Sequence, residues 1–427
     1  MRPIFLLIAC LFSFSLNSAE AKPEIKNASA RLEEDLPSFE STLLDPNPKA
    51  IVAGCVNAIT GDFFDTSVDL VVPGVLPIVV QRFYSSRSKK WSFGHKPLLR
   101  VGPLEEEKLI AASYQDDRGS GSYFEGREGF NLKVPSKMVK KGLTNLSTEE
   151  ISGQTHWKNS YLSFKERTFS KKEKGKFYDL RHSSLIHRYF KSFHPKGNNK
   201  QFGKFYLFKE FHPGGNSLHY SYLKDGRLRL IEAKNKLSEP LSRLKVYENS
   251  LDSNSLWLEG DRHVKYYFEN HRLIKAMTTD TIPIDYHYDD HKRVKKKAFP
   301  DGRALYIEYY NEGKDKHHVK ALGAPIGPKG KIAVTYQFEY GFKDGKKTTL
   351  VKDALGCETK YECDRYKRLS TIKRFDSTDT FLWGEFDTPN AGNFLYRYFS
   401  SGGKHLFCTG FEYDAFGNIT KEKLYGN

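Results

Sequence analysis

Apolar and aromatic positions alternate with polar ones through most of the second half of the chain. The run Leu218–Tyr222 alternates in this way, and so does the run Arg227–Ile231 that follows it. A period of two predicts a strand with one buried face. Asp225 and Gly226 lie between the runs and tolerate the positive φ that a tight hairpin turn needs. The pattern therefore predicts strand, turn and strand within about 21 residues, too few to include a helix of ordinary length.

The same hairpin pattern recurs along the chain. An aromatic residue is followed, a few positions later, by a basic residue and then an aliphatic one. Anchors at positions 267, 288 and 309, and at 342 and 363, are 21 residues apart. A fixed period of this length indicates one repeated supersecondary unit. The defining residues are Tyr220, Tyr222, Gly226 and Arg227; Tyr286, Tyr288 and Arg293; Tyr361 and Arg368; the turn glycines Gly302 and Gly356; and looser copies that run from Tyr267 to Arg272 and from Phe342 to Lys347.

These hairpins are expected to pair edge to edge. A lone hairpin is marginally stable in water, so the copies need to form one continuous sheet. The 31 Phe and 25 Tyr suit a pleated, half-buried surface. The alternative is a platform that stacks sugars or nucleobases, but regular spacing over the whole array favours a structural ladder. The Gly- and Pro-rich segment 323–330 is interpreted as an insertion that breaks the period.

Two parts of the chain resemble the Rhs family. The segment Phe411–Thr420 is similar to its YD repeats, with Tyr413, Asp414 and Gly417 at matching positions. Near the start, the segments 56–63, 69–78 and 81–86, followed by Trp91–Gly94, resemble the module that precedes the repeats in that family. The resemblance to the YD repeats extends, in degenerate form, over residues 205–427.

The resemblance implies a β-hairpin ribbon that spirals into a hollow shell. In long members of the family the shell encloses a C-terminal toxin, which is released after self-cleavage. No toxin segment follows the repeats in this sequence, so we expect an arc of shell rather than a container. The expected fold class is all-β, with repeated antiparallel hairpins in a long curved, spiralling sheet.

The first residues have the features of an export signal. Arg2 gives a charged start, Ile4–Leu16 an apolar stretch and Ala19–Ala21 a cleavage site. A lipidation box ending at Cys10 is an alternative. The expected organisation is a signal peptide at 1–21, a flexible arm at 22–49, an Rhs-type N-terminal β module at 50–104, an unassigned β-rich region at 105–204 and repeats at 205–427. The mature chain is expected to be periplasmic, on the cell surface or secreted, with no transmembrane segment.

Cysteines and charge add little chemistry. Four cysteines remain after cleavage, and sequence does not rank their three pairings: Cys55, Cys357, Cys363 and Cys408. The net charge is +16, and the basic run 291–297 is interpreted as a solvated face rather than a nucleic-acid site. His317 and His318 are interpreted as solvated surface, and no cysteine or histidine spacing fits zinc.

The sequence predicts a structural protein without catalytic, cofactor or metal residues. It contains no nucleotide-binding glycine loop, no Gly-x-Ser-x-Gly elbow and no His-Glu-x-x-His helix. Asp225, Asp301, Asp344 and Asp353 flank turn glycines, where carboxylates cap backbone amides. The first hypothesis is an exported shell fragment with a protein partner or toxin cargo. The alternative is a glycan-binding module or adhesin at the cell surface; a hydrolase within 105–200 is the weakest hypothesis.

Overall fold

A computed structural model describes most of the chain from residue 50 onward. The expected signal peptide, flexible arm and lipidation box at Cys10 lie outside the described residues, as do the Asp344–Gly345 turn and Gly417. The described ranges are 50–93, 97–103, 109–115, 121–127, 161–170, 173–181, 186–192, 203–248, 255–259, 262–279, 282–326, 330–343, 346–365, 368–385, 388, 390, 393–414 and 419–426.

The described residues form strands and turns with no helix, and the strands pair in antiparallel fashion. The predicted all-β class and its repeated hairpins are confirmed. The repeat sheet contains β9 (Tyr161–Ser170), β10 (Glu173–Arg181), β11 (His187–Lys191), β12 (Gly203–Phe211), β13 (Ser217–Tyr222), β14 (Leu228–Lys234), β15 (Pro240–Glu248), β16 (Ser255–Glu259), β17 (His263–Glu269), β18 (Arg272–Thr278), β19 (Ile284–Tyr288), β20 (Val294–Ala298), β21 (Ala304–Tyr309), β22 (Val319–Ile326), β23 (Lys331–Lys343), β24 (Lys346–Asp353), β25 (Glu358–Cys363), β26 (Leu369–Lys373), β27 (Ser377–Trp383), β28 (Phe394–Ser401), β29 (Lys404–Tyr413) and β30 (Ile419–Gly426).

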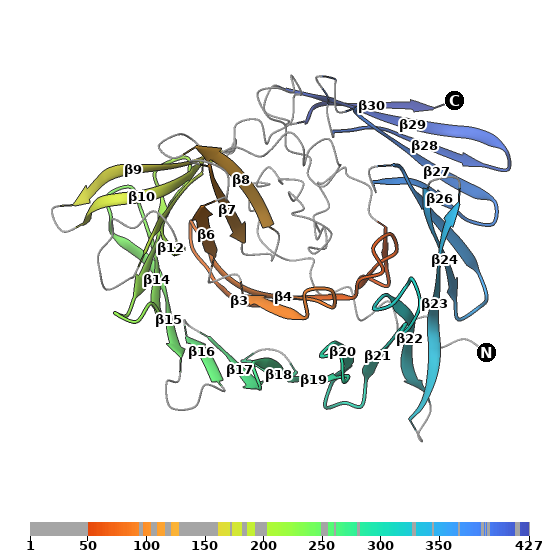
Figure 1. The fold of residues 1–427 in the computed structure, drawn as a ribbon, viewed down its shortest axis with the longest axis horizontal. Coiled ribbons are helices and arrows are strands. Elements are labelled where there is room, and N and C mark those ends of the chain that lie inside the picture. The colour runs from red at the N-terminus through yellow and green to blue at the C-terminus, as the bar shows by residue number, and fades with distance from the viewer. Residues whose placement is uncertain are drawn as a thin grey trace.

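Each strand of the repeat sheet pairs with the next one along the chain, from β9 to β30. The sheet branches once, at β12. One edge of β12 pairs with β11, while the other pairs with β13 along Lys209–Phe211 and with β6 along Gly203–Tyr206. Beyond the branch lie β6 (Leu98–Pro103), β7 (Leu109–Gln115) and β8 (Gly121–Arg127). Figure 1 shows the sheet as a curved wall around these strands, with β9 and β30 far apart along the arc.

The N-terminal module lies on the concave side of the wall. It contains β1 (Ile51–Val52), β2 (Val56–Asn57), β3 (Phe64–Val72), β4 (Ile78–Ser85) and β5 (Lys90–Phe93). In Figure 1 the β3–β4 hairpin runs along the inside of the arc. Its strands contact β14, β15 and β17, while β5 contacts β18. Leu70, Val72, Ile78 and Val80 are buried in the core that the two layers share, so the module covers the apolar face that the repeats expose.

Several hairpins of the array contain a β-bulge at their aromatic anchor. Tyr222 pairs with Leu228 and Tyr288 with Val294, and in both hairpins the register shifts at the aromatic residue. A bulge adds one residue to one strand and increases the local twist. Between the β17–β18 and β19–β20 hairpins the pairing is short, because β18 and β19 share only the pairs Lys275–Asp285 and Ala276–Ile284. The strands therefore splay apart at this junction.

Two of the predicted anchors are wrong. The register shift in the β17–β18 hairpin falls at Phe268, which pairs with Leu273 and so takes the place assigned to Tyr267. Tyr267 lies on the opposite face, where the Lys265 ammonium is 4.8 Å from its ring centroid. Phe342 is exposed, because the β23–β24 hairpin continues without a bulge to its turn. A regular alternation does not reveal where the extra bulge residue falls.

The predicted insertion at 323–330 is also wrong in its first half. Gly323–Ile326 belong to β22 and pair with β23, so the sheet continues through them. A Cβ on Gly323 would lie 2.8 Å from Ile332 Cγ2, which explains why glycine occurs within this strand. The longer spacing between repeats arises instead from the extended β22–β23 hairpin.

The four cysteines of the described residues are free thiols. Cys55 and Cys363 lie in or against the main core, whereas Cys357 is exposed in the turn between β24 and β25. Burial, with a smaller contribution from Asp65, raises the pKa of the Cys55 thiol to about 12. Because only the thiolate is nucleophilic, Cys55 is expected to be inert in the folded protein.

Thiol labelling tests this arrangement. With Ellman's reagent at pH 8, Cys357 is expected to react within the mixing time, while Cys55 and Cys363 react only after denaturation. Peptide mapping after alkylation identifies the labelled positions, and Cys357→Ser serves as the control that removes the fast phase. Fast labelling of Cys55 in the native protein would contradict the two-layered packing.

Candidate functional site

The anchor aromatics join neighbouring hairpins through their polar atoms. Tyr288 Oη donates to the Leu273 carbonyl over 2.6 Å, and Tyr309 Oη donates to the Val294 carbonyl over 2.8 Å. Both carbonyls belong to the aliphatic residue of the preceding hairpin, at the point where the strands splay. A side-chain hydroxyl therefore replaces the missing bond of the sheet, as buried carbonyls require. The same contact occurs from Tyr222 to Leu207, from Trp383 Nε1 to Leu369 and from Tyr413 to Phe394.

The basic residue of the repeat stacks on the same ring. Arg293 lies over the Tyr309 ring with its guanidinium carbon 4.2 Å from the centroid. Arg272 over Tyr288 and Arg368 over Trp383 repeat this contact at 5.7 and 5.4 Å. A guanidinium over an aromatic face is stabilising, more so when it is removed from water. The arginine and the aliphatic residue of one repeat thus form a single contact with the aromatic anchor of the next repeat.

Turn carboxylates hold these arginines in place. Asp289 accepts the Arg293 backbone N–H over 2.8 Å and the Arg293 Nε–H over 2.7 Å. The same double contact joins Asp225 to Arg227, Asp301 to Arg303 and Asp364 to Arg368. Asp353 caps the amides of Leu355 and Cys357 at 2.9 Å. The predicted capping role is confirmed for Asp225, Asp301 and Asp353, and the arginine contacts are additional.

A buried charge network joins the N-terminal module to the repeat sheet. Arg82 of β4 is about 1% exposed and forms an ion pair with Asp69 of β3. Its other terminal nitrogen donates to Tyr286 Oη over 3.1 Å. Tyr286 in turn donates to Asp65 over 2.6 Å, and Tyr266 donates to Asp69 over 2.6 Å. Two module carboxylates and one module arginine are therefore bound by two repeat tyrosines.

Further contacts extend this network along the repeats. Lys297 Nζ lies 2.7 Å from Asp65 Oδ1, so β20 also contributes a cation. Trp91 Nε1 donates to Tyr288 Oη over 2.8 Å, and the Val294 amide donates to Tyr84 Oη over 3.0 Å. The module thus binds both the anchor and the splayed backbone of the same repeat.

Burial and charge shift the titration of these groups. Burial acts to raise the pKa of Asp65, but Lys297 and Arg82 outweigh it and hold the pKa below its usual range. Burial and the neighbouring carboxylates raise the pKa values of Tyr266 and Tyr286 well above 10. At neutral pH Asp65 is therefore ionised and the two tyrosines are neutral donors, which matches the hydrogen bonds that they form.

A second contact lies at β22. The Val319 amide donates to the Gly61 carbonyl over 2.8 Å, and His318 packs between Gly61 and the Tyr340 ring. A Cβ on Gly61 would approach His318 Cγ to 2.5 Å, and the residue has φ +74°. Burial and the nearby cation of Lys347 lower the pKa of His318 to about 4. The prediction of solvated histidines is wrong for His318, because the module covers it.

The basic run 291–297 is likewise not a uniformly solvated face. Arg293 is about 1% exposed, and its guanidinium also donates to Asn311 Oδ1 over 2.8 Å. Lys297 points to Asp65 inside the molecule. Lys292 is exposed in the turn and Lys295 on the strand. Alternation within β20 sends part of the run to each face of the sheet.

The predicted repeat residues have different places in the structure. Tyr220 and Tyr286 are buried in the core, while Tyr222, Tyr288, Tyr413, Arg293 and Arg368 form the contacts between units. Gly226, Gly302 and Gly356 adopt positive φ in turns beside Arg227 and Arg303. Tyr361 packs against the core, and Asp414 follows the last described anchor. The structure does not gather these residues in one cleft; it spaces them along the wall.

Sequence reasoning missed the charged residues of the module. Asp65, Asp69 and Arg82 occupy strands whose alternation predicts an apolar inner face. A charged residue at an inward position of such a strand was the available signal, because buried charges need partners. The partner residues lie about 200 positions away in the chain, and no local pattern identifies them.

The described side chains offer no metal site, since no group of three His, Cys, Asp or Glu residues comes together among them. No helix within the described ranges is long and apolar enough to cross a membrane. We call the network of Asp65, Asp69 and Arg82 with Tyr266, Tyr286 and Lys297 the seam. Its charges and hydroxyls bind one another and hold the two layers together, while the buried Nε of Arg82 has no hydrogen-bond partner.

The comparisons with known proteins bear mainly on the module. Residues 53–96 match a family described as a domain of unknown function, DUF6531. The match covers β2 to β5 and the charged residues of the seam. Among curated proteins, none is similar enough to match the chain.

Several solved structures are similar in part. The structure of TcdB2-TccC3 without its hypervariable C-terminal region has a TM-score of 0.33 and 8% identity, covering 86% of this chain and 26% of that one. A porin-like protein from Bacteroides uniformis has a TM-score of 0.23 and 8% identity, covering 51% and 91%. The N-terminal domain of the effector SpvB from Salmonella typhimurium has a TM-score of 0.21 and 10% identity, covering 85% and 98%. The chain spans about a quarter of the first of these proteins.

Removing one anchor hydroxyl tests the contact between units. Tyr309→Phe leaves the Val294 carbonyl buried without its donor, so unfolding free energy should fall by about 1–3 kcal/mol. The matched control is Tyr267→Phe, which lies on the other face and should change stability by less than about 0.5 kcal/mol. Urea denaturation of both variants measures the difference. Equal effects would show that the anchor hydroxyl has no special part.

Acid unfolding tests the carboxylate of the seam. The folded pKa of Asp65 is lowered, so its stabilisation is present above about pH 4 and is lost as pH falls through the folded pKa. Wild-type stability should therefore fall below pH 4 with an extra slope of up to about 1.4 kcal/mol per pH unit relative to Asp65→Asn. Denaturant titrations between pH 2 and 6 measure both slopes. Parallel curves would contradict a paired Asp65.

Proposed function

We propose that this chain is an exported, non-enzymatic structural protein, an arc of an Rhs-type β-shell that needs a partner or further repeats to enclose cargo. The single observation that carries the proposal is the two-layered seam. The polar atoms of the residues that define the repeats form hydrogen bonds to neighbouring repeats or to the module. Such an arrangement supports a wall, because rigidity and curvature come from the same contacts. The match of residues 53–96 to DUF6531 falls on the module of that seam.

The hollow side of the wall is the surface proposed to face the partner. Within β3 and β4, Val71 and Val79 are register partners on the face opposite the buried Leu70 and Val80. They are 43% and 39% exposed, so the hairpin offers aliphatic contact area toward the hollow of the arc. Exposed apolar area of this kind is typical of interaction surfaces.

The alternative glycan-binding function has less geometric support. The aromatic rows that suggested a sugar platform face the module, and Tyr266 and Tyr286 are buried with their hydroxyls bound to carboxylates. A stacking platform needs open aromatic faces. A glycan array with charged and neutral sugars separates the two functions, since the shell proposal expects no sugar signal.

Cross-linking in the cell that produces the chain tests the shell proposal. Wild type is expected to cross-link to one partner or to a cargo chain, and Val71→Glu with Val79→Glu should abolish that product. Leu355→Glu, in an exposed turn, serves as the control and should leave it unchanged. A chain that stays a lone monomer, or a partner that is unaffected by the Val71 and Val79 changes, would contradict the proposal.

A further inference from the structure

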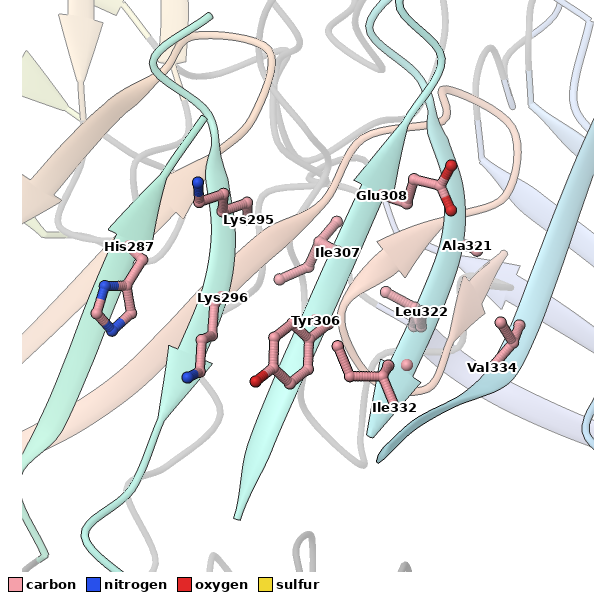
Figure 2. Close-up of a pocket in the computed structure, with 11 residues that line it drawn as sticks. His287, Lys295, Lys296, Tyr306, Ile307, Glu308, Ala321, Leu322, Ile332 and Val334 are labelled. Atoms are coloured by element: carbon pink, nitrogen blue, oxygen red, sulfur yellow. The ribbon is translucent and has the colours of Figure 1, made fainter. Parts of the chain in front are cut away.

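A hollow of about 480 Å³ lies on the wall, over β19 to β23. Figure 2 shows the residues that line it, from His287 on β19 to Val334 on β23. A single cross-strand row passes through it, because His287 pairs with Lys296, Lys296 with Tyr306, Tyr306 with Gly323 and Gly323 with Val334. The volume is within the range of ligand pockets in proteins, about 300–1,000 Å³.

The hollow exists because Gly323 has no side chain. The glycine sits in the row between Tyr306 and Val334, where any other residue would fill the space. A Cβ there would also collide with Ile332 Cγ2 at 2.8 Å. From Lys296 to Val334 the row crosses three strand spacings, or roughly 14 Å.

The two ends of the hollow differ in chemistry. The bulge in the β19–β20 hairpin puts the consecutive residues Lys295 and Lys296 at one end, beside His287. Glu308, which also lines the hollow, is bound to Lys320 over 2.6 Å, and no carboxylate pairs with Lys295 or Lys296 among the described residues. At the other end the aliphatic side chains of Ile332 and Val334 are 47% and 45% exposed.

We propose that this hollow binds an anionic amphiphile, an aliphatic chain with a terminal carboxylate. The carboxylate lies at Lys295 and Lys296, and the chain crosses Gly323 to Ile332 and Val334. The lysines supply charge that no carboxylate of the described residues neutralises, and the glycine supplies depth for a narrow chain. Burial of the exposed aliphatic side chains supplies the apolar part of the binding energy.

Other ligand classes fit the hollow less well. Sugars favour open aromatic faces, but the one tyrosine of the row has the Lys296 ammonium 5.1 Å from its ring centroid, and no other tyrosine, tryptophan or phenylalanine lines the hollow. An acidic peptide has polar backbone groups along its whole length, whereas the far end of the hollow offers only aliphatic side chains. The observations therefore favour an acyl chain over both.

Calorimetric titration of the chain from residue 22 with dodecanoate, below its micelle concentration, tests the proposal. Saturable binding at one site is expected, with dodecanol at least about tenfold weaker because it lacks the charge. Lys295→Gln with Lys296→Gln should weaken dodecanoate about tenfold, and Val334→Asn should weaken both probes. The matched control is Lys352→Gln, an exposed lysine of β24 outside the hollow, which should leave affinity within about twofold. Thermal unfolding confirms that each variant is folded.

Four results would overturn the proposal. The first three are an absence of dodecanoate binding, equal binding of dodecanoate and dodecanol, and equal dodecanoate affinity in the wild type and the double lysine variant. A tighter, lysine-dependent affinity for an oligoglutamate peptide than for dodecanoate would also overturn it and would assign the hollow to acidic peptides.

Discussion

The charge of Arg82 has to be neutralised inside the protein, and the two-layered arrangement depends on how this is achieved. A buried guanidinium without partners is strongly destabilising. Asp69 supplies an anion from the same hairpin, but Tyr286 and Tyr266 come from the repeat sheet and complete the network. The buried charges of the module therefore find their partners only when the module lies at one position on the wall. That requirement fixes which repeats it covers and with which side chains.

The wall has a matching requirement of its own. Where strands of neighbouring repeats splay, a buried carbonyl that has lost its partner in the sheet needs a donor from the next anchor. Tyrosine supplies it at Val294 and Leu273, and Trp383 supplies it at Leu369 with an indole N–H instead of a hydroxyl. At these three junctions a hydroxyl or an indole N–H therefore serves the same purpose. Module and repeats meet at the same places, because Tyr84 and Trp91 bind the backbone and anchor of these junctions.

Local patterns predicted the strands, the turns and the repeat, because alternation and turn glycines report on neighbours in sequence. They misplaced Tyr267, because a bulge shifts the phase by one residue without changing residue types. They assigned His318 to solvent, because its cover comes from Gly61, far away in the chain. They also missed the partners of Arg82, since a charge network between layers is a tertiary property. The regular part of the fold was predictable, and the seam was not.

Hydrogen exchange of Arg82→Met measures most directly whether the seam couples the two layers. Arg227→Met, in an exposed turn, is the comparison. The seam predicts that amides of β3 and β4 lose protection together with those of β17 to β20, while the comparison variant exchanges like wild type. Loss of protection confined to β3–β5, with β17 to β20 unchanged, would show that the repeat wall stands without the module and would contradict the account.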